Sequence, residues 1–133
     1  MSEQTNTKIV QDAYAAFGRA DIPALLSLLS ADVDWQAIVG AGPKVPTTGL
    51  RQGQAAVGQF FKDLAGSILF STFDPREFVA QGDKVVALGH YAGKANKTGR
   101  TFASDWVMVF TIKNGKIAHF REYADVVAIT AAF

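Results

Sequence analysis

Acid–base chemistry in this chain would centre on Glu122, a carboxylate among apolar neighbours. At alternate positions of the same segment it is flanked by Phe120 and Ala124. Apolar surroundings disfavour the charged form of a carboxyl group, so its pKa rises toward the range that suits a general acid or base. A structural glutamate paired with Arg121 or with a helix residue fits the same sequence, and both interpretations stay open at this point.

Two tyrosines could assist such a carboxylate. Tyr91 lies on the side of its predicted strand that we expect to face the interior, and its hydroxyl could donate a hydrogen bond to a ligand carbonyl. Tyr14, on the first predicted helix, could act in the same way. Both could instead be core tyrosines with satisfied hydroxyl groups. The wall of a ligand cavity, or plain core packing, is expected from Trp35, Trp106, Met108 and Phe120.

Several other kinds of chemistry find no support in the sequence. It contains no cysteine, which excludes thiolate catalysis and Cys-based metal sites. Its two histidines, His90 and His119, fall on the strand face opposite to Tyr91 and Glu122, so no metal site is expected. Glycine motifs that bind phosphate and the nucleophile motif G-x-S-x-G do not occur. We therefore expect any reaction to proceed without a metal or cofactor.

Length and composition favour a single domain over residues 1–133. Hydrophobic residues make up 49% of the chain, enough to form a core. Lysine and arginine number 13 and aspartate and glutamate 12, and this net charge of +1 argues against a nucleic-acid partner. No apolar run is long enough for a membrane span, and the polar segment 1–8 lacks the features of a secretory signal. We expect a cytoplasmic protein with no membrane partner.

Helical periodicity dominates the first half of the chain. Apolar residues recur at helical spacing over 4–18 and 54–68, which predicts two amphipathic helices. Between them, Asp21 and Pro23 favour the start of another helix. This second helix is expected to be short and strongly buried, with Leu25, Leu26, Leu28 and Leu29.

Alternation of polar and apolar residues replaces this period in the second half. Strands are predicted over 33–38, 70–80, 84–95, 102–113 and 116–124. Turn residues such as Asn114-Gly115 join the last four strands into an antiparallel meander, and helices followed by strands indicate an α+β class. The glycine- and proline-rich segment 39–53 is either a lid over a site or a simple connection. Residues 125–133 are expected to form a terminal turn or helix.

Both faces of the predicted sheet are largely apolar. On strand 102–113, Val107, Val109 and Thr111 alternate with larger apolar residues. Because three helices can cover only one face, we expect a homodimer that packs through the outer face of the sheet. On the last strand, alternation groups Ile117, His119, Arg121 and Tyr123 on one face and Ala118, Phe120, Glu122 and Ala124 on the other. We expect the face that carries Glu122 to point inward.

The order and spacing of several motifs resemble those of a known family. The motifs are VQDAYAAF at 10–17, AD at 20–21, DVDW at 32–35, TGLRQG at 48–53, WVMVF at 106–110, NGKI at 114–117 and FREYAD at 120–125. Together they resemble the SnoaL-like, ketosteroid isomerase-related branch of the nuclear transport factor 2-like superfamily. The likeness covers almost the whole chain, and it is specific for a fold and not for a reaction.

The resemblance implies a cone-shaped half-barrel, in which three N-terminal helices pack on a curved, mostly antiparallel sheet around an apolar cavity. It also implies dimerisation through the outer sheet face. Glu122 matches an acidic position on the last strand that several cyclases and epoxide hydrolases use, and Tyr14 corresponds to the oxyanion tyrosine of the steroid isomerases. Ala37 replaces the base of those isomerases and could only line the cavity, and Trp106 replaces their oxyanion-hole acid.

The chain therefore lacks residues that the steroid isomerases and the epoxide hydrolases use for their reactions. The middle-strand Arg and Asp of the epoxide hydrolases fall near Gly89 and Tyr91. We expect the chain to bind a small apolar molecule, carbonyl-bearing or polycyclic, and to catalyse cofactor-free proton transfer of the isomerase, cyclase or dehydratase type. Glu122 would be the acid or base, aided by Tyr91 and Tyr14. The alternative is a ligand-binding or dimerisation module without catalytic activity.

Overall fold

A bent six-stranded sheet carries the helices of this protein on its concave side. The computed structural model describes residues 2–133. In chain order the elements are α1 (Glu3–Gly18), α2 (Ile22–Ser27), β1 (Leu29–Gln36), β2 (Leu50–Gln52), α3 (Gln54–Ser67), β3 (Ile68–Gln81), β4 (Lys84–Ala95), β5 (Thr101–Lys113), β6 (Lys116–Ala124) and α4 (Val126–Ala132). The strand order is β2-β1-β6-β5-β4-β3, and only the β1–β6 pair is parallel. The predicted α+β class and the antiparallel meander of the last four strands are confirmed.

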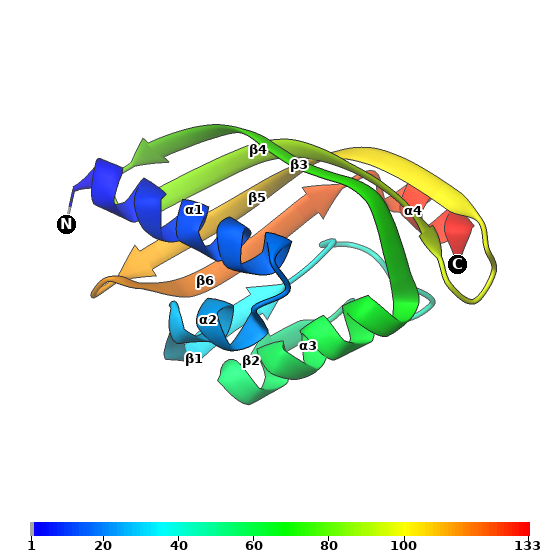
Figure 1. The fold of residues 1–133 in the computed structure, drawn as a ribbon, viewed down its shortest axis with the longest axis horizontal. Helices are drawn as coiled ribbons and strands as arrows, with labels where there is room; N and C mark the ends of the chain where they lie inside the picture. Colours follow the sequence, from blue (N-terminus) through cyan, green and yellow to red (C-terminus); the bar gives the residue numbers. More distant parts are fainter. Residues whose placement is uncertain (1) are drawn as a thin grey trace.

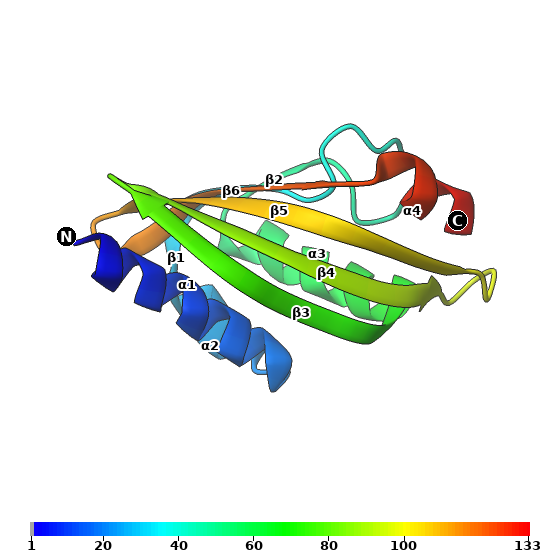
Figure 2. The same ribbon diagram turned by 90° about the horizontal axis from the view of Figure 1, so that it is seen from above.

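The helices α1, α2 and α3 close the concave face of the sheet (Figure 1), and the curvature is clearest along β3 and β4 (Figure 2). Ser2 caps α1 by accepting a hydrogen bond from the Thr5 amide, and Asp21 caps α2 in the same way. The buried stripes of α1 and α3 consist of Asn6, Val10, Ala13, Ala16, Val57, Phe60 and Phe61. These stripes face the sheet and leave a cone between the two layers. Within residues 2–133, none of the helices is long and apolar enough to cross a membrane.

The region after α2 differs from the sequence-based prediction. The helix ends at Ser27, and Leu29 already belongs to β1, which starts four residues before the predicted strand. The reason is pairing with β6, since the Ile117 amide donates to the Leu28 carbonyl at 2.9 Å. Tertiary pairing here overrides the helical preference of leucine. The short strand β2 was also missed, because its three residues lie inside the glycine-rich segment predicted as a loop.

The start of β6 departs from simple alternation. The β5–β6 register shifts between Thr111 and Ile112, which marks a β-bulge. A shift of one residue turns a side chain to the opposite face, and Ile117 accordingly faces the interior with its side chain fully buried. Its predicted position on the same face as His119 is therefore wrong. Beyond the bulge, Phe120 and Glu122 are buried as expected and Tyr123 is exposed.

Gly89 makes room for the buried indole of Trp106, which is its cross-strand partner. A Cβ atom at position 89 would come within 2.6 Å of a Trp106 ring carbon and within 2.6 Å of the Asp74 carbonyl oxygen. We expect Gly89→Ala to destabilise the fold by about 2 kcal/mol, since the clash involves backbone as well as a packed ring. Urea unfolding would measure it, with Gly66→Ala, where an added Cβ meets nothing within 4 Å, as the control. Equal stabilities of the two variants would contradict this packing.

Candidate functional site

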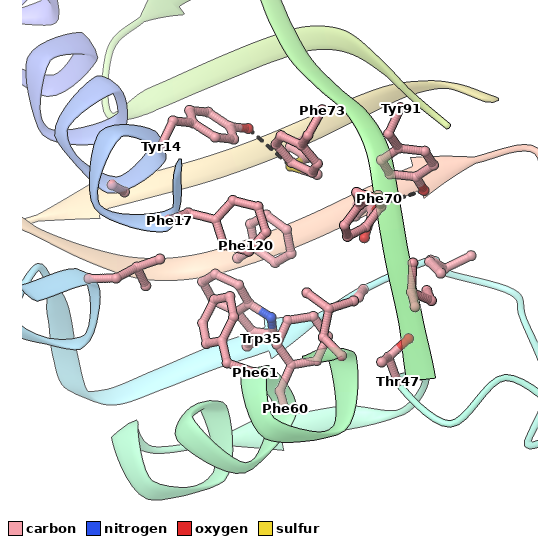
Figure 3. A pocket seen from close by; sticks show the side chains of 18 of the residues that line it. Tyr14, Phe17, Trp35, Thr47, Phe60, Phe61, Phe70, Phe73, Tyr91 and Phe120 are labelled. Carbon is pink, nitrogen blue, oxygen red and sulfur yellow. Dashed lines mark hydrogen bonds between the residues drawn. The ribbon is translucent and has the colours of Figure 1, made fainter. Parts of the chain in front are cut away.

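An apolar cavity lies between the helices and the concave face of the sheet. The volume within which the centre of a water molecule can move is about 70 Å³. This volume is several times the volume that a single bound water requires on the same measure. Figure 3 shows Tyr14, Phe73 and Tyr91 on one side of the cavity and Trp35, Phe60, Phe61 and Thr47 on the other. Ile129 of α4 also lines it. Helix α4 is held by the β4–β5 turn, where Thr98 and Arg100 donate hydrogen bonds to the carbonyls of Ala132 and Ala131.

Glu122 projects from β6 into this cavity. It is 5% exposed and is the only buried acidic or basic side chain among residues 2–133. The inward orientation predicted from strand alternation is found, and the alternative pairing with Arg121 is not. Arg121 lies on the other face of β6, where its guanidinium meets the Asp34 carboxylate at 2.5 Å. The Glu122 carboxylate instead accepts a hydrogen bond of 2.7 Å from the Tyr91 hydroxyl.

Burial raises the pKa of Glu122 to about 7. Hydrogen bonds from the Tyr91 hydroxyl and the Ile38 backbone favour the carboxylate and partly oppose this rise in pKa. Ile38 has a φ of 45°, a left-handed conformation that is rare for a β-branched residue. Next to it, the Val39 amide donates to the Glu122 carbonyl at 2.8 Å. The backbone after β1 is thus bent around the acid, and strained residues of this kind cluster at functional sites.

The two predicted tyrosines both line the cavity, but they have different partners. The Tyr14 hydroxyl donates to the Met108 sulfur at 3.0 Å, whereas Tyr91 donates to Glu122. Burial, followed by the nearby charge of Glu122, raises the pKa of both tyrosines far above the ordinary value. Both hydroxyls therefore keep their protons at neutral pH and remain hydrogen-bond donors.

The structure brings together most of the residues predicted for the wall. Trp35, Ala37, Met108 and Phe120 all line the cavity. The Trp35 indole stacks on the Phe120 ring with a centroid distance of 3.9 Å. Trp106 is buried but is not among the lining residues, in contrast to the prediction. Its ring lies over Gly89 and packs against three aromatic rings of the cavity wall, those of Tyr14, Phe73 and Tyr91.

Sequence reasoning missed several lining residues. The aromatic wall also includes Phe17, Phe60, Phe61, Phe70, Phe73, Phe102 and Phe110. The apolar stripe of α3 could have identified Phe60 and Phe61. Thr47 carries no comparable signal, because it lies in an irregular segment between Pro46 and Thr48. It is nevertheless only 1% exposed and lines the cavity.

Among residues 2–133 there is no group of three or more His, Asp or Glu side chains that could hold a metal ion. His90 and His119 lie on the outer side of the sheet, in contact with Asp105 and Asp34 respectively. The residues that line the cavity carry five polar groups: the Glu122 carboxyl, the two tyrosine hydroxyls, the Thr47 hydroxyl and the Trp35 N–H. The last two have no hydrogen-bond partner among the described residues.

The fold has close counterparts among known proteins. A nuclear transport factor 2-like protein from Burkholderia xenovorans is 35% identical over 99% of this chain and 98% of its own, with a TM-score of 0.88. A second such protein, from Burkholderia pseudomallei, is 27% identical over 99% and 98% of the two chains, with a TM-score of 0.84. TerC, co-crystallised with polyporic acid, is 29% identical over 96% of this chain and 97% of its own, with a TM-score of 0.81.

No curated protein matches this chain. The SnoaL-like domain family, in contrast, matches residues 10–120, which run from within α1 to Phe120 of β6, two residues before Glu122. The curved sheet, the helices on its concave face and this match agree with one another. The chain belongs to the SnoaL-like family and has the nuclear transport factor 2-like cone fold.

Proposed function

We propose that this protein binds a small, largely apolar molecule with a carbonyl group and catalyses proton transfer on it without a cofactor, as an isomerase, cyclase or dehydratase would. The observation that carries the proposal is Glu122: an acid buried in an aromatic cavity, with a pKa of about 7 and a tyrosine hydroxyl at 2.7 Å. A base with a pKa near the working pH is well suited to proton transfer. The polyporic acid bound to TerC supports an aromatic, oxygen-bearing ligand.

In the proposed step the Glu122 carboxylate removes a proton from a carbon next to the ligand carbonyl. The C–H bond breaks, an O–H bond forms on Glu122, and the electron pair moves onto the carbonyl oxygen. Tyr91 then no longer faces a charged carboxylate, so its hydroxyl can turn to donate to the negative oxygen. Glu122 finally returns the proton to another carbon, or to the same one, and regains its charge.

A binding module without catalytic activity is the second candidate. It is favoured by the hydrogen bonds already made, since the Tyr14 hydroxyl is engaged with Met108 and that of Tyr91 with Glu122. In this case the carboxyl group would only orient a ligand.

Exchange of hydrogen for deuterium distinguishes the two candidates. β-Tetralone, an aromatic ketone with acidic C–H bonds beside its carbonyl, would be incubated with the protein in D₂O and followed by proton NMR. Proton transfer predicts exchange that is first order in protein and faster than in protein-free buffer. A binding module would shift or broaden the tetralone signals without faster exchange, and that result would overturn the catalytic proposal.

We also propose that the protein forms a homodimer through the outer face of the sheet. Two cross-strand rows on this face are largely apolar, with one charged residue at an end of each. Leu88, Val107 and Tyr123 lie in one row with Glu77, and Val79, Val86 and Val109 lie in the other with Arg121. Val79 is 56% exposed and Tyr123 46%. A row of half-covered apolar side chains on a sheet is typical of a surface that packs against another protein.

The oligomeric state can be tested with one charge on this face. We expect the unmodified protein to have the mass of a dimer by light scattering and Val107→Glu to have that of a monomer, because a buried unpaired carboxylate is costly at an interface. Val127→Glu, at an exposed valine on α4, is the control and should stay dimeric. An unmodified protein that is monomeric at high micromolar concentration would contradict the proposal.

A further inference from the structure

Two polar atoms in the cavity have no hydrogen-bond partner among the described residues. They are Nε1 of Trp35 and Oγ1 of Thr47. Both side chains are more than nine-tenths buried, at 5% and 1% exposure, and both line the cavity. Buried polar groups are nearly always hydrogen-bonded, so two such atoms in one cavity require an explanation.

The surroundings hold each of these atoms in place. Trp35 is stacked on Phe120 and touches the rings of Phe60 and Phe61, at centroid distances of 5.7 Å each. Its indole therefore has little freedom to seek another partner.

Thr47 is fixed by the segment between β1 and β2. Its neighbour Thr48 closes the turns of that segment, because the single hydroxyl proton of Thr48 is shared between the carbonyls of Val45 at 2.9 Å and Gly42 at 3.1 Å. Val45 anchors the segment with a fully buried side chain. The segment thus uses the Thr48 hydroxyl for its own structure and leaves that of Thr47 available to the cavity.

Neither atom takes part in the hydrogen bond between Tyr91 and Glu122. Figure 3 shows three separate places on the cavity wall: Trp35 lies next to α3, Thr47 next to the lower end of β3, and Tyr91 next to the upper part of that strand. The indole N–H can only donate, and the threonine hydroxyl can donate and accept. A ligand atom that satisfies Trp35 must therefore be an acceptor, such as a carbonyl or ether oxygen.

We propose that Trp35 and Thr47 each provide a further polar contact in the cavity, and that they bind oxygens of a flat aromatic ligand of which another oxygen faces Glu122 and Tyr91. The ligand class is then an aromatic molecule with oxygen atoms at separate places, of which one at least accepts a hydrogen bond, as in quinones and hydroxylated aromatic ketones. The aromatic walls favour the flat ring, and the separate polar groups favour the oxygens. This inference rests on the proposed ligand-binding function and specifies its ligand.

The test compares two probes that share a ring system. Lawsone, a hydroxylated naphthoquinone, has oxygens on opposite edges of the ring, and naphthalene has none. Equilibrium dialysis with ultraviolet detection would give the affinity of both probes for the unmodified protein and for Trp35→Phe and Thr47→Val. Thr47→Val removes the polar atom and keeps a similar shape, whereas Trp35→Phe removes the N–H together with one ring of the indole. Thr72→Val, at an exposed threonine on β3, is the control.

We expect Thr47→Val to weaken lawsone binding about three- to tenfold, the loss of one hydrogen bond, with unchanged naphthalene binding. Trp35→Phe also changes the aromatic wall, so we expect it to weaken lawsone binding about three- to tenfold more than it changes naphthalene binding. Thr72→Val should bind both probes as the unmodified protein does. Naphthalene binding that is retained also shows that the variants are folded. Two results would overturn this inference. In the first, the variants bind lawsone as tightly as the unmodified protein, as they would if bound water satisfied both groups. In the second, the variants lose affinity for both probes equally. An unmodified protein that binds neither probe contradicts the proposed function itself.

Discussion

Glu122→Gln is expected to slow deuterium exchange of β-tetralone at least a hundredfold. Glutamine has nearly the same shape and can still accept a hydrogen bond from Tyr91, but it cannot take a proton from carbon. General base catalysis contributes about 10²- to 10⁴-fold to such reactions, which sets the size of the loss. Because the carboxylate is the active form, the exchange rate of the unmodified protein should rise with pH and level off above its midpoint near 7.

Two further variants make this experiment specific. Glu77→Gln changes an exposed glutamate on β3 and should exchange the ketone at the unmodified rate. Tyr91→Phe removes a hydrogen bond that favours the Glu122 carboxylate, so the midpoint of the pH profile should move upward. An unreduced exchange rate in Glu122→Gln would exclude Glu122 as the base. An unchanged midpoint in Tyr91→Phe would show that the pH profile does not depend on the hydrogen bond between Tyr91 and Glu122.

The contribution of Glu122 to the stability of the fold should fall as the pH rises from about 4.5 to about 7. Burial raises the pKa of Glu122 from its ordinary 4.5 to about 7, so in this interval the folded protein holds a proton that the unfolded chain releases. The stabilisation from the protonated acid is complete below about pH 4.5 and is lost as the pH passes through the folded-state pKa. The difference corresponds to about 3 kcal/mol in the free energy of unfolding.

Urea unfolding of the unmodified protein and of Glu122→Gln, each at about pH 4 and about pH 8, isolates this contribution. Other groups also titrate in this range, but they do so in both proteins, and the difference between the two cancels them. We expect Glu122→Gln to gain about 3 kcal/mol relative to the unmodified protein between the lower and the higher pH. Parallel stability curves for the two proteins would mean that Glu122 titrates as an ordinary exposed glutamate does.

Much of the architecture was predictable because periodicity is a local property. The stripes of α1 and α3 and the alternation of β3 to β6 appear directly in the sequence. Alternation grouped Glu122 with Phe120 and two alanines, and these apolar neighbours favoured the inward position that is found. Predictions failed where pairing with a strand distant in sequence decides the local structure or the direction of a side chain. Leu29 joins β1 because β6 lies beside it, and Ile117 turns inward because a bulge shifts the β5–β6 register.

The candidate site was predictable only in part, for similar reasons. Trp35, Met108 and Phe120 follow from strand parity and Ala37 from the family resemblance, but the same parity placed Trp106 in the wall. A glycine inside a strand indicates that another group approaches closely, so Gly89 was the available sign that the indole lies across the neighbouring strand. The left-handed backbone of Ile38 and the buried hydroxyl of Thr47 depend on how the segment after β1 folds back, and local sequence carries no mark of either.

The most direct test of the account is the pKa of Glu122 itself. The glutamates of the chain are Glu3, Glu77 and Glu122, so selective ¹³C labelling of glutamate carboxyl carbons gives a simple spectrum, and Glu122→Gln assigns the signal of interest. We predict that this signal titrates with a midpoint near pH 7. A Glu122 midpoint near 4.5 would contradict the buried acid on which the proposed chemistry depends.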